Sequence, residues 1–531
     1  MTVQMFDWAL MLAPLAFALI ALASWFYPKG GNKALLQGSR WASVLSIAIA
    51  LWVALGLYFQ GDKDLILFEY AGLGIGFRLD SVSVLLFGMI ALIGFVVVRY
   101  SINYMDGEQR QGSFMGRLAA TIASVQLLVL SGNLLLLFIA WVLTSVCLHR
   151  LLVFYPERAG GLIAAKKKFI MARLGDVSLF VAFALLYQQF GTGHLTQLFQ
   201  QVSQETWGTG TELAAIFIAL AAVLKSAQFP THGWLIEVME TPTPVSALLH
   251  AGLLNGGPFL IIRMAQVMEF STAGPSLLIA IGGFTALFAS LAFLTQSSVK
   301  TALSYSSVAH MGFSLFACGL GAYSAAMLHL VAHSFYKAHA FLSSGSAIDT
   351  LKIARINPVK RLSNPWNILW GLLLALGVYA GLLYLLSLLG IVPSFGVRVI
   401  GSIIVMGMAS LLVSAFDSAA WRKLLPRTSL MVLAVATSFF VLETSMHKVI
   451  MAQLPASITL HPAERLLSLV LLGVFGLVVV LQMRYPDWSS QPRFRSLAVH
   501  VKNGLYANAL FDRWINALAV QPSINKKQKL A

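Results

Sequence analysis

Runs of about twenty apolar residues recur along the whole chain and constrain its fold more than any other feature of the sequence. Apolar residues make up 58% of the 531 positions and charged residues 11%, which is too apolar for a soluble globular domain. Because a membrane offers the backbone no water, such runs must form helices. The sequence therefore predicts an all-α polytopic membrane protein with about fifteen transmembrane helices. We expect the helices near residues 6–26, 41–59, 82–105, 114–131, 133–155, 168–190, 212–241, 243–269, 276–296, 299–319, 321–349, 366–390, 397–421, 428–446 and 464–483.

Lysine and arginine gather in alternate connections between these runs. The formal net charge of +16 therefore indicates membrane orientation and not a nucleic-acid partner. Since cytoplasmic loops carry the excess of basic residues, we expect the N-terminus outside and the basic tail, residues 484–531, in the cytoplasm. The basic connections hold Lys29, Lys33 and Arg40; Arg110 and Arg117; Arg158 and Lys166 to Lys168; Lys352, Arg355, Lys360 and Arg361; and Arg422, Lys423 and Arg427.

Two segments depart from the apolar pattern. Residues 62–80 alternate in polarity and are rich in glycine, which predicts a short hairpin outside the membrane. In the tail, residues 491–520 have helical spacing, and we expect them to lie along the membrane surface, whereas residues 525–531 should be disordered. The first apolar run lacks a preceding basic stretch, so we interpret it as a retained helix and not as a cleaved signal.

The stretch from Leu224 to Arg263 places ionisable side chains within otherwise apolar sequence. A lysine such as Lys225 costs about 3 kcal/mol or more in hydrocarbon unless it meets a partner or water, so it indicates function. Pro230 removes a helical hydrogen bond, and broken helices at membrane depth are tolerated where they are buried in protein or line a wet cavity. We therefore predict that Lys225 lies beside a polar path that continues to His250 on the next run.

A second polar stripe lies in the run 321–349. His329, His333 and Lys337 are spaced by four residues, so they share one face of a helix. Three titratable groups on one face in hydrocarbon favour a proton path over isolated polar groups that neighbouring helices satisfy. We expect His310 of the preceding run to contact this stripe. Lys300 either joins the same path or extends to the cytoplasmic surface.

Motifs for metals and redox cofactors are missing from the sequence. Position 330 is a leucine, so the HExxH zinc motif is absent. Cys147 and Cys318 lack the paired spacing of a metal site or a disulfide framework. Flavin, nicotinamide and iron–sulfur motifs are also absent. We therefore expect no cofactor in this chain and no enzymatic activity of its own, with any catalysis residing in a partner subunit.

The stretch KSAQFPTHGWL at 225–235, followed by TPTPVSALLHA at 241–251, resembles the signature of the antiporter-like proton-channel subunits of respiratory complex I and of multisubunit sodium/proton antiporters. The resemblance extends from about residue 134 to residue 346. It implies two inverted five-helix repeats with discontinuous helices and a proton relay through the residues named above. The implied units are 1–105, 106–269 (first repeat), 270–425 (second repeat), 426–483 and 484–531.

The sequence departs from that family at the partner of the broken-helix lysine. The family carries a glutamate in the fifth helix, and Val142 stands at that position here. Since a buried ammonium needs a countercharge to hold its proton, we hypothesise that Asp176, Glu237 or Glu240 has taken this role. Asp176 could equally form an ordinary ion pair with Arg173, three residues before it. The run 366–390 is also uncharged where the family carries a further lysine.

Within the family, the missing glutamate and the histidine-rich stripe look most like the membrane subunit of the DAB-type inorganic carbon pump. This resemblance implies proton-driven uptake of carbon dioxide and bicarbonate at a bacterial inner membrane. It also implies a large peripheral partner, of the DabA type, that binds zinc, resembles carbonic anhydrase and docks on the cytoplasmic face. Two alternatives stay open: a proton-pumping subunit of a complex I-like or hydrogenase redox complex, and a cation/proton antiporter subunit.

Overall fold

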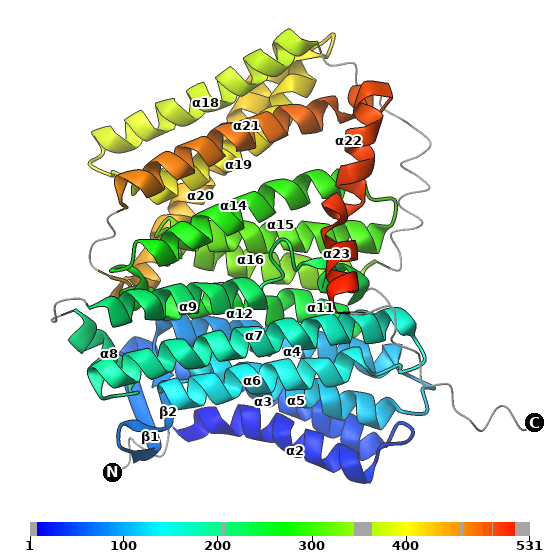
Figure 1. Ribbon diagram of the computed structural model, residues 1–531, viewed down its shortest axis with the longest axis vertical. Coiled ribbons are helices and arrows are strands. Elements are labelled where there is room, and N and C mark those ends of the chain that lie inside the picture. The colour runs from blue at the N-terminus through cyan, green and yellow to red at the C-terminus, as the bar shows by residue number, and fades with distance from the viewer. Residues whose placement is uncertain are drawn as a thin grey trace, which may run out of the picture.

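The computed structural model describes residues 8–203, 208–238, 241–344, 364–455, 460–490 and 492–515. Long helices lie side by side and run in similar directions across the molecule (Figure 1). A β-hairpin lies at one end of the helices, which we call the hairpin end. The C-terminal helices α22 (Pro492–Lys502) and α23 (Ala507–Trp514) cross the opposite end, which we call the tail end (Figure 1).

The N-terminal part combines three long helices with the hairpin. Asn32 begins the second of these helices, and its side chain accepts a hydrogen bond from the Ala34 amide at 2.9 Å. The hairpin reverses direction at Ala71 and Gly72, where positive φ angles of 50° and 75° produce a two-residue turn. The predicted hairpin is thus confirmed, while its position outside the membrane stays a prediction. The elements are η1 (Trp8–Met11), α2 (Leu12–Phe26), α3 (Lys33–Gln60), β1 (Lys63–Tyr70), β2 (Leu73–Leu79) and α4 (Ser81–Tyr104).

The middle of the chain forms a tightly packed helical group that contains two interrupted helices. Asn133 begins the second helix of the group, where its side chain accepts a hydrogen bond from the Leu135 amide at 2.9 Å. The elements are α5 (Gln111–Leu130), α6 (Leu134–Leu152), α7 (Ala159–Phe190), α8 (Leu195–Val202), α9 (Thr209–Lys225), α10 (Gly233–Glu237), α11 (Thr243–Ala251), η3 (Leu253–Asn255), α12 (Gly256–Arg263) and α13 (Ala265–Met268).

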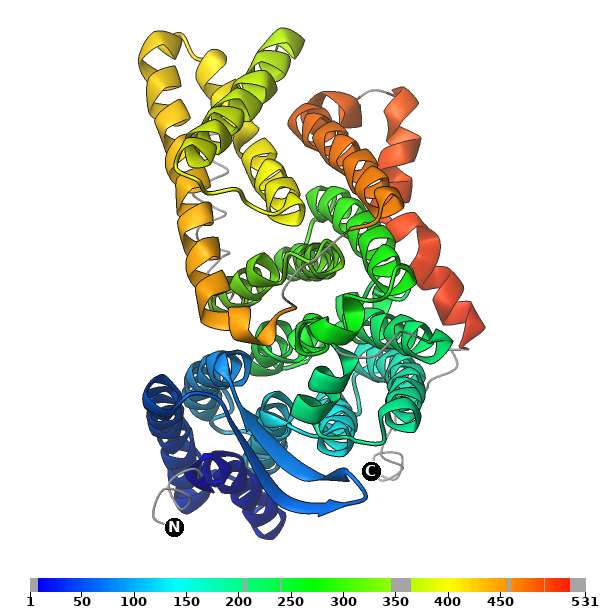
Figure 2. The same cartoon turned by 90° about the vertical axis from the view of Figure 1, so that its left-hand side faces the viewer.

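The last part begins with a close helix pair and ends with the tail helices. The two helices of the pair are in close contact at Gly282 and Gly312, since a Cβ atom at Gly282 would lie 2.7 Å from the Gly312 carbonyl oxygen. Seen from the hairpin end, the yellow helices lie far from the N-terminal helices, and an orange helix reaches back toward the centre (Figure 2). The elements are α14 (Ala273–Leu294), α15 (Val299–Gly319), α16 (Tyr323–Leu342), α18 (Pro365–Leu388), α19 (Phe395–Phe416), α20 (Trp421–Ile450), η4 (Met451–Gln453), α21 (Pro462–Ser490), α22, η5 (Gly504–Tyr506) and α23.

The helices have the length and composition of membrane spans. Within the described part of the chain, twelve are long and apolar enough to cross a membrane. Large apolar side chains such as Trp25 and Phe59, each 75% exposed, face outward as lipid-contacting residues do. The all-α polytopic fold is confirmed. The count of about fifteen is not, because α9, α15 and α16 are too short or too polar to be among the twelve. The unit boundaries drawn from the repeats stay predictions.

Three helices begin well before the start that we predicted. α3 begins at Lys33 and not near residue 41, so Lys33 and Arg40 of a predicted basic loop are helical. α7 begins at Ala159 and not near residue 168, so Lys166, Lys167 and Lys168 are helical and the predicted loop there was wrong. The physical reason is that neither proline nor glycine interrupts the chain between Gly161 and Gly175. α20 likewise begins at Trp421, which places three further basic residues of a predicted loop within the helix: Arg422, Lys423 and Arg427.

The described part of the tail packs on the bundle. α22 contacts α14, and α23 contacts α10; that residues 491–520 lie along the membrane surface stays a prediction. The predicted disorder of residues 525–531 lies outside the described residues.

Candidate functional site

Two helix interruptions meet in the interior. α9 ends at Lys225 and α10 begins at Gly233, with a cis peptide bond between Phe229 and Pro230 in the connection. The second interruption separates α11 from α12. A Cβ atom at Gly256, the first residue of α12, would lie 3.6 Å from Lys225 Cε. The side chain of Lys225 therefore extends along the start of α12.

Three neutral oxygens of α6 hold the amine of Lys225. The Nζ atom donates to the Trp141 carbonyl at 3.0 Å, to Thr144 Oγ1 at 2.9 Å and to Ser145 Oγ at 2.9 Å. It also lies 4.1 Å from the centre of the Trp141 ring. We call these four residues the first lysine site. An ammonium has three donors, and the site offers one acceptor for each of them.

The three acids that we considered as countercharges for Lys225 differ in their partners. Asp176 pairs with Arg173 at 2.6 Å and lies within electrostatic range of Lys225. Glu237 pairs with Lys167 instead, at 2.5 Å. Glu240 lies outside the described residues.

A buried polar cluster closes the tail end of this region. Lys167 is fully buried and donates to Glu237 of α10, to Asn508 of α23 at 2.8 Å and to Asp512 of α23. Asn508 also donates to Glu237 at 2.9 Å. We call these four residues the tail latch. It fixes the C-terminal helix α23 against α7 and against the helix that follows Pro230.

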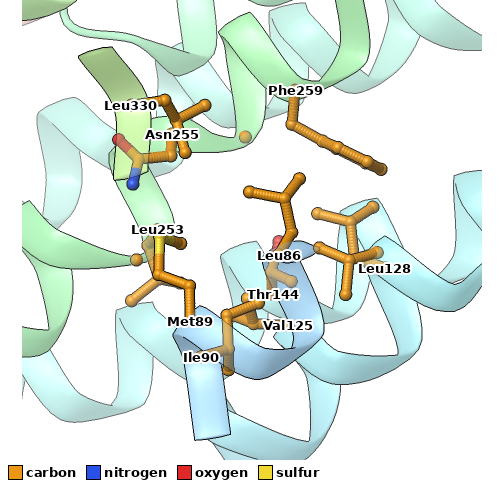
Figure 3. Close-up of a pocket in the computed structure, with 13 residues that line it drawn as sticks. Leu86, Met89, Ile90, Val125, Leu128, Thr144, Leu253, Asn255, Phe259 and Leu330 are labelled. Atoms are coloured by element: carbon orange, nitrogen blue, oxygen red, sulfur yellow. The ribbon is translucent and has the colours of Figure 1, made fainter. Parts of the chain in front are cut away.

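A small cavity lies between the first lysine site and α16, the helix that carries Lys337. Its volume is ≈ 20 Å³, which is enough for one water molecule. Thr144 and Asn255 are polar side chains in its otherwise mostly apolar lining (Figure 3). The Asn255 amide nitrogen donates to Ser334 of α16 at 2.7 Å, while its Oδ1 atom has no hydrogen-bond partner among the described residues. The cavity therefore connects a ligand of Lys225 with the helix that carries Lys337.

The histidines form a compact group beside Lys337. The ring of His310 lies 5.1 Å from that of His329 and 4.7 Å from that of His333, and His310 Nδ1 is 3.3 Å from His329 Nε2. We call these three residues the histidine cluster. Lys337 is fully buried, and its Nζ atom donates to the Leu303 carbonyl of α15 at 3.2 Å. The structure thus brings the predicted stripe on α16 together with His310.

His250 and Lys300 take different places. His250 of α11 is fully buried, stacks on Phe341 at 4.2 Å and lies within electrostatic range of Lys337. Lys300 is half-buried at the start of α15, ten residues before His310. That separation is about 15 Å along a helix, so Lys300 lies toward the tail end and away from the histidine cluster.

The hairpin end of the second interrupted helix is anchored by an ion cluster. Arg263, at the end of α12, donates to Asp80 Oδ2 at 2.5 Å and to Ser83 Oγ at 2.6 Å, and Arg78 also pairs with Asp80 at 2.7 Å. Burial raises the pKa of Asp80, but the two guanidinium groups and the hydrogen bonds more than offset this and hold it at about 2. α12 is therefore fixed to the start of α4.

Comparison with known proteins assigns the chain to a family. It matches the family described as NADH:quinone oxidoreductase/Mrp antiporter, TM, over residues 131–416, more than half of its length. The chain belongs to this antiporter family. Residues 68–115 also match the family described as NADH-Ubiquinone oxidoreductase (complex I), chain 5 N-terminus. The resemblance inferred from the stretch 225–251 is confirmed.

Relatives of this antiporter-family chain include carbon transporter subunits. It is 34% identical to the probable inorganic carbon transporter subunit DabB2 of Halothiobacillus neapolitanus, over 94% of this chain and 92% of that one. It is 39% identical to the probable inorganic carbon transporter subunit DabB of Hydrogenovibrio crunogenus, over 59% and 60%. It is also 32% identical to NADH-quinone oxidoreductase subunit L of Campylobacter jejuni, over 58% and 52%.

Solved structures share the fold. The Mrp complex of a Dietzia species matches with a TM-score of 0.63 and 23% identity, over 96% of this chain and 59% of that one. An archaeal membrane-bound sulfane sulfur reductase matches with a TM-score of 0.59 and 17% identity, over 97% and 99%. At these identities the likeness establishes the antiporter-like fold alone.

Sequence reasoning missed part of the site. Lys167 and Lys168 are 0% and 5% exposed, although we had assigned both to a basic loop. The uninterrupted helical stretch before Arg173 was the signal that could have placed them in the helix. The oxygens of Trp141, Thr144 and Ser145 gave no signal, because carbonyls and hydroxyls are common in helices. Among the described residues, no group of three or more His, Cys, Asp or Glu side chains is arranged to hold a metal ion.

Proposed function

We propose that this chain is the proton-translocating membrane subunit of an energy-coupled inorganic carbon uptake complex. The observation that carries the proposal is the row of ionisable side chains that spans both helix interruptions: Lys225, His250, Lys337 and the histidine cluster. Ionisable groups in a membrane interior mark proton and ion paths. The relative named as an inorganic carbon transporter subunit, alike over nearly the whole chain, supports the choice of substrate.

The first lysine site suits a group that repeatedly gains and loses a proton. When Lys225 is charged, its three donors meet three acceptors. When it is neutral, the hydroxyl of either Thr144 or Ser145 can rotate to donate to its single lone pair. Both protonation states therefore find hydrogen-bond partners in the site. Fixed neutral ligands therefore replace the carboxylate that the family pattern places at position 142.

A proton that leaves Lys225 can continue toward α16, which carries Lys337. The ≈ 20 Å³ cavity provides room for a water between Thr144 and Asn255, and Asn255 is tied to α16 through Ser334. Two rings of the histidine cluster can relay a proton directly, since His310 Nδ1 and His329 Nε2 are 3.3 Å apart. We propose that Lys225, His250, Lys337 and the histidine cluster carry the proton in turn.

A partner subunit would use the energy of this flow. Each proton that crosses the membrane releases about 2.3 kcal/mol per 100 mV of potential, and a partner can use it only if its own state is coupled to the relay. We propose that the partner is a large zinc-binding, carbonic-anhydrase-like subunit of the DabA type, which makes bicarbonate from carbon dioxide. The tail end is the proposed docking face, because its basic residues and α23 offer charge for complementary contacts.

A redox complex is the second candidate, and a specific observation favours it. Relatives named as quinone oxidoreductase subunits align over 58% to 66% of the chain. The family model that matches residues 131–416 is described by both quinone oxidoreductase and antiporter, so redox-driven pumping is a coherent use of the same path. The named carbon transporter subunit aligns over 94% of the chain, which is why we rank carbon uptake first.

Purification from the native membrane tests the proposal. We expect one large zinc-containing protein to leave the membrane with this chain, identified by mass spectrometry and elemental analysis. The pair, expressed together, should restore growth in ordinary air to a host that lacks carbonic anhydrase, and the same pair with Lys225→Ala should not. Recovery of iron–sulfur and quinone-binding subunits instead would favour the second candidate, and failure of the wild-type pair to restore growth would count against the first.

A further inference from the structure

Lys168 is a buried lysine that the relay described so far leaves unused. It lies in α7, is 5% exposed, and its Nζ atom donates to the Ser145 carbonyl oxygen at 2.8 Å. Among the described residues it forms no ion pair within hydrogen-bonding range. Because a buried ammonium without a paired acid is costly, an amine at this position either has a structural role or exchanges its proton.

Ser145 links Lys168 to the first lysine site. Its carbonyl accepts from Lys168 and its hydroxyl accepts from Lys225, so one residue separates the two amines. Two positive charges held this close in a membrane interior repel each other, so charging one amine favours the neutral form of the other. Such a pair passes a single proton more readily than it holds two.

Lys168 also lies on the tail-end side of Lys225, where protons that arrive from that end would enter the path. The next residue toward the helix start, Lys167, belongs to the tail latch and reaches α23 at the tail end. Lys168 therefore stands between the tail end and Lys225. The charged and titratable groups that interact electrostatically with Lys168 come from three helices: Asp176 and Arg173 on α7, Lys225 on α9, and Cys147 and His149 on α6.

We propose that Lys168 is a proton-carrying member of the path that exchanges protons with Lys225 across Ser145 and so forms its tail-end entrance. In one transfer, the Lys168 amine turns from the Ser145 carbonyl oxygen, its acceptor in the structure, to the hydroxyl oxygen of the same residue, where an N–H bond of Lys168 breaks and the proton passes to that hydroxyl oxygen. The hydroxyl gives its own proton to neutral Lys225, so the serine ends unchanged and the positive charge has moved from one amine to the other. The inference rests on the proposed role of Lys225 as a proton carrier.

Two substitutions separate proton exchange from a structural role. Lys168→Gln removes the charge, whereas Lys168→Arg keeps the charge but cannot release a proton. Lys166→Gln, which removes a charge from the same turn at a half-buried position, is the matched control. Each variant is purified as the assembled complex and reconstituted in liposomes, and proton flux per assembled complex is measured with a pH-sensitive dye under an imposed membrane potential.

We expect both Lys168 variants to lower the flux by about ten-fold to a hundred-fold and to change its pH profile, while Lys166→Gln behaves as the wild type. Wild-type flux and pH profile in Lys168→Gln would overturn the inference. So would full flux in Lys168→Arg, even if Lys168→Gln failed to assemble, because a fixed charge would then suffice. If Lys225→Ala abolished flux and the Lys168 variants did not, this inference would fall and the proposed function would stand. Normal flux in Lys225→Ala would instead remove the proposed function.

Discussion

Asn255 donates a 2.7 Å hydrogen bond to Ser334, and this contact joins the second helix interruption to the helix that carries Lys337. The same asparagine is a polar part of the cavity that also reaches Thr144. Asn255 thus links a cavity beside a ligand of Lys225 to the helix that carries Lys337. The contact matters because a proton cannot pass an apolar gap without water or a side chain to carry it.

Replacing Asn255 by alanine should slow proton flux by about ten-fold, because the cavity would lose a polar wall and the link to Ser334. Asn367→Ala is the control, since Asn367 donates to Asp417 far from the relay. Flux in liposomes that contain the purified complex measures the effect. Equal rates for the two variants would show that the path does not run through the cavity.

Removing one hydroxyl ligand of Lys225 should also slow transport. Thr144→Val keeps the shape of the side chain but leaves the amine with two acceptors, so we expect flux to fall by about three-fold to ten-fold. Thr121→Val is a matched control, because Thr121 is equally buried and, like Thr144, donates to a carbonyl of its own helix, but it accepts no hydrogen bond from Lys225. The same loss in both variants would indicate a general effect of removing a buried hydroxyl.

Asp80→Asn should destabilise the protein, because it leaves Arg263 buried without its counterion. The expected loss is about 3 kcal/mol, seen as a fall of about 5 °C in the melting temperature. Glu69→Gln, on the exposed face of the hairpin, should change little.

The pH dependence of this effect follows from the lowered pKa of Asp80. A carboxylate with a lowered folded-state pKa stabilises the fold above its unfolded value, and the contribution disappears as pH falls toward about 2. The difference between wild type and Asp80→Asn should therefore be constant between about pH 5 and pH 8. A difference that shrank across that interval would contradict the assignment.

Gly233→Val should loosen the C-terminal helix from the bundle. A Cβ atom at Gly233 would lie 1.7 Å from Asn508 Oδ1, so a larger side chain must displace the Asn508 side chain and with it open the tail latch that holds α23. Trypsin cleavage after Lys502 or Arg513 should become faster in this variant. Gly377→Val is the control, because a Cβ atom at Gly377 meets open space. Unchanged cleavage in Gly233→Val would mean that α23 is not held where the structure places it.

The sequence alone was sufficient to identify functional residues where a residue type is energetically unfavourable in its surroundings. Lys225, Pro230 and the stripe on α16 were identifiable because charge, imidazole and a missing amide are costly in hydrocarbon. The hairpin was predictable from alternation and glycine. The all-α membrane fold could be predicted from the length of the apolar runs alone.

The rest needed three-dimensional contacts. Lys168 has the same sequence context as surface lysines, and only the packing of α7 on α6 shows that its amine meets Ser145. Glu237 was a candidate partner of Lys225 because both flank Pro230, but the α23 helix, over 270 residues later, helps to hold it on Lys167. Long-range contacts of this kind leave no local pattern.

The most direct test of the account is proton flux through the reconstituted complex with alanine at Lys225 or at Lys337. The account predicts that each substitution stops flux under an imposed membrane potential while the complex still assembles in wild-type amounts. Flux at the wild-type rate in the variant that carries both substitutions would contradict it.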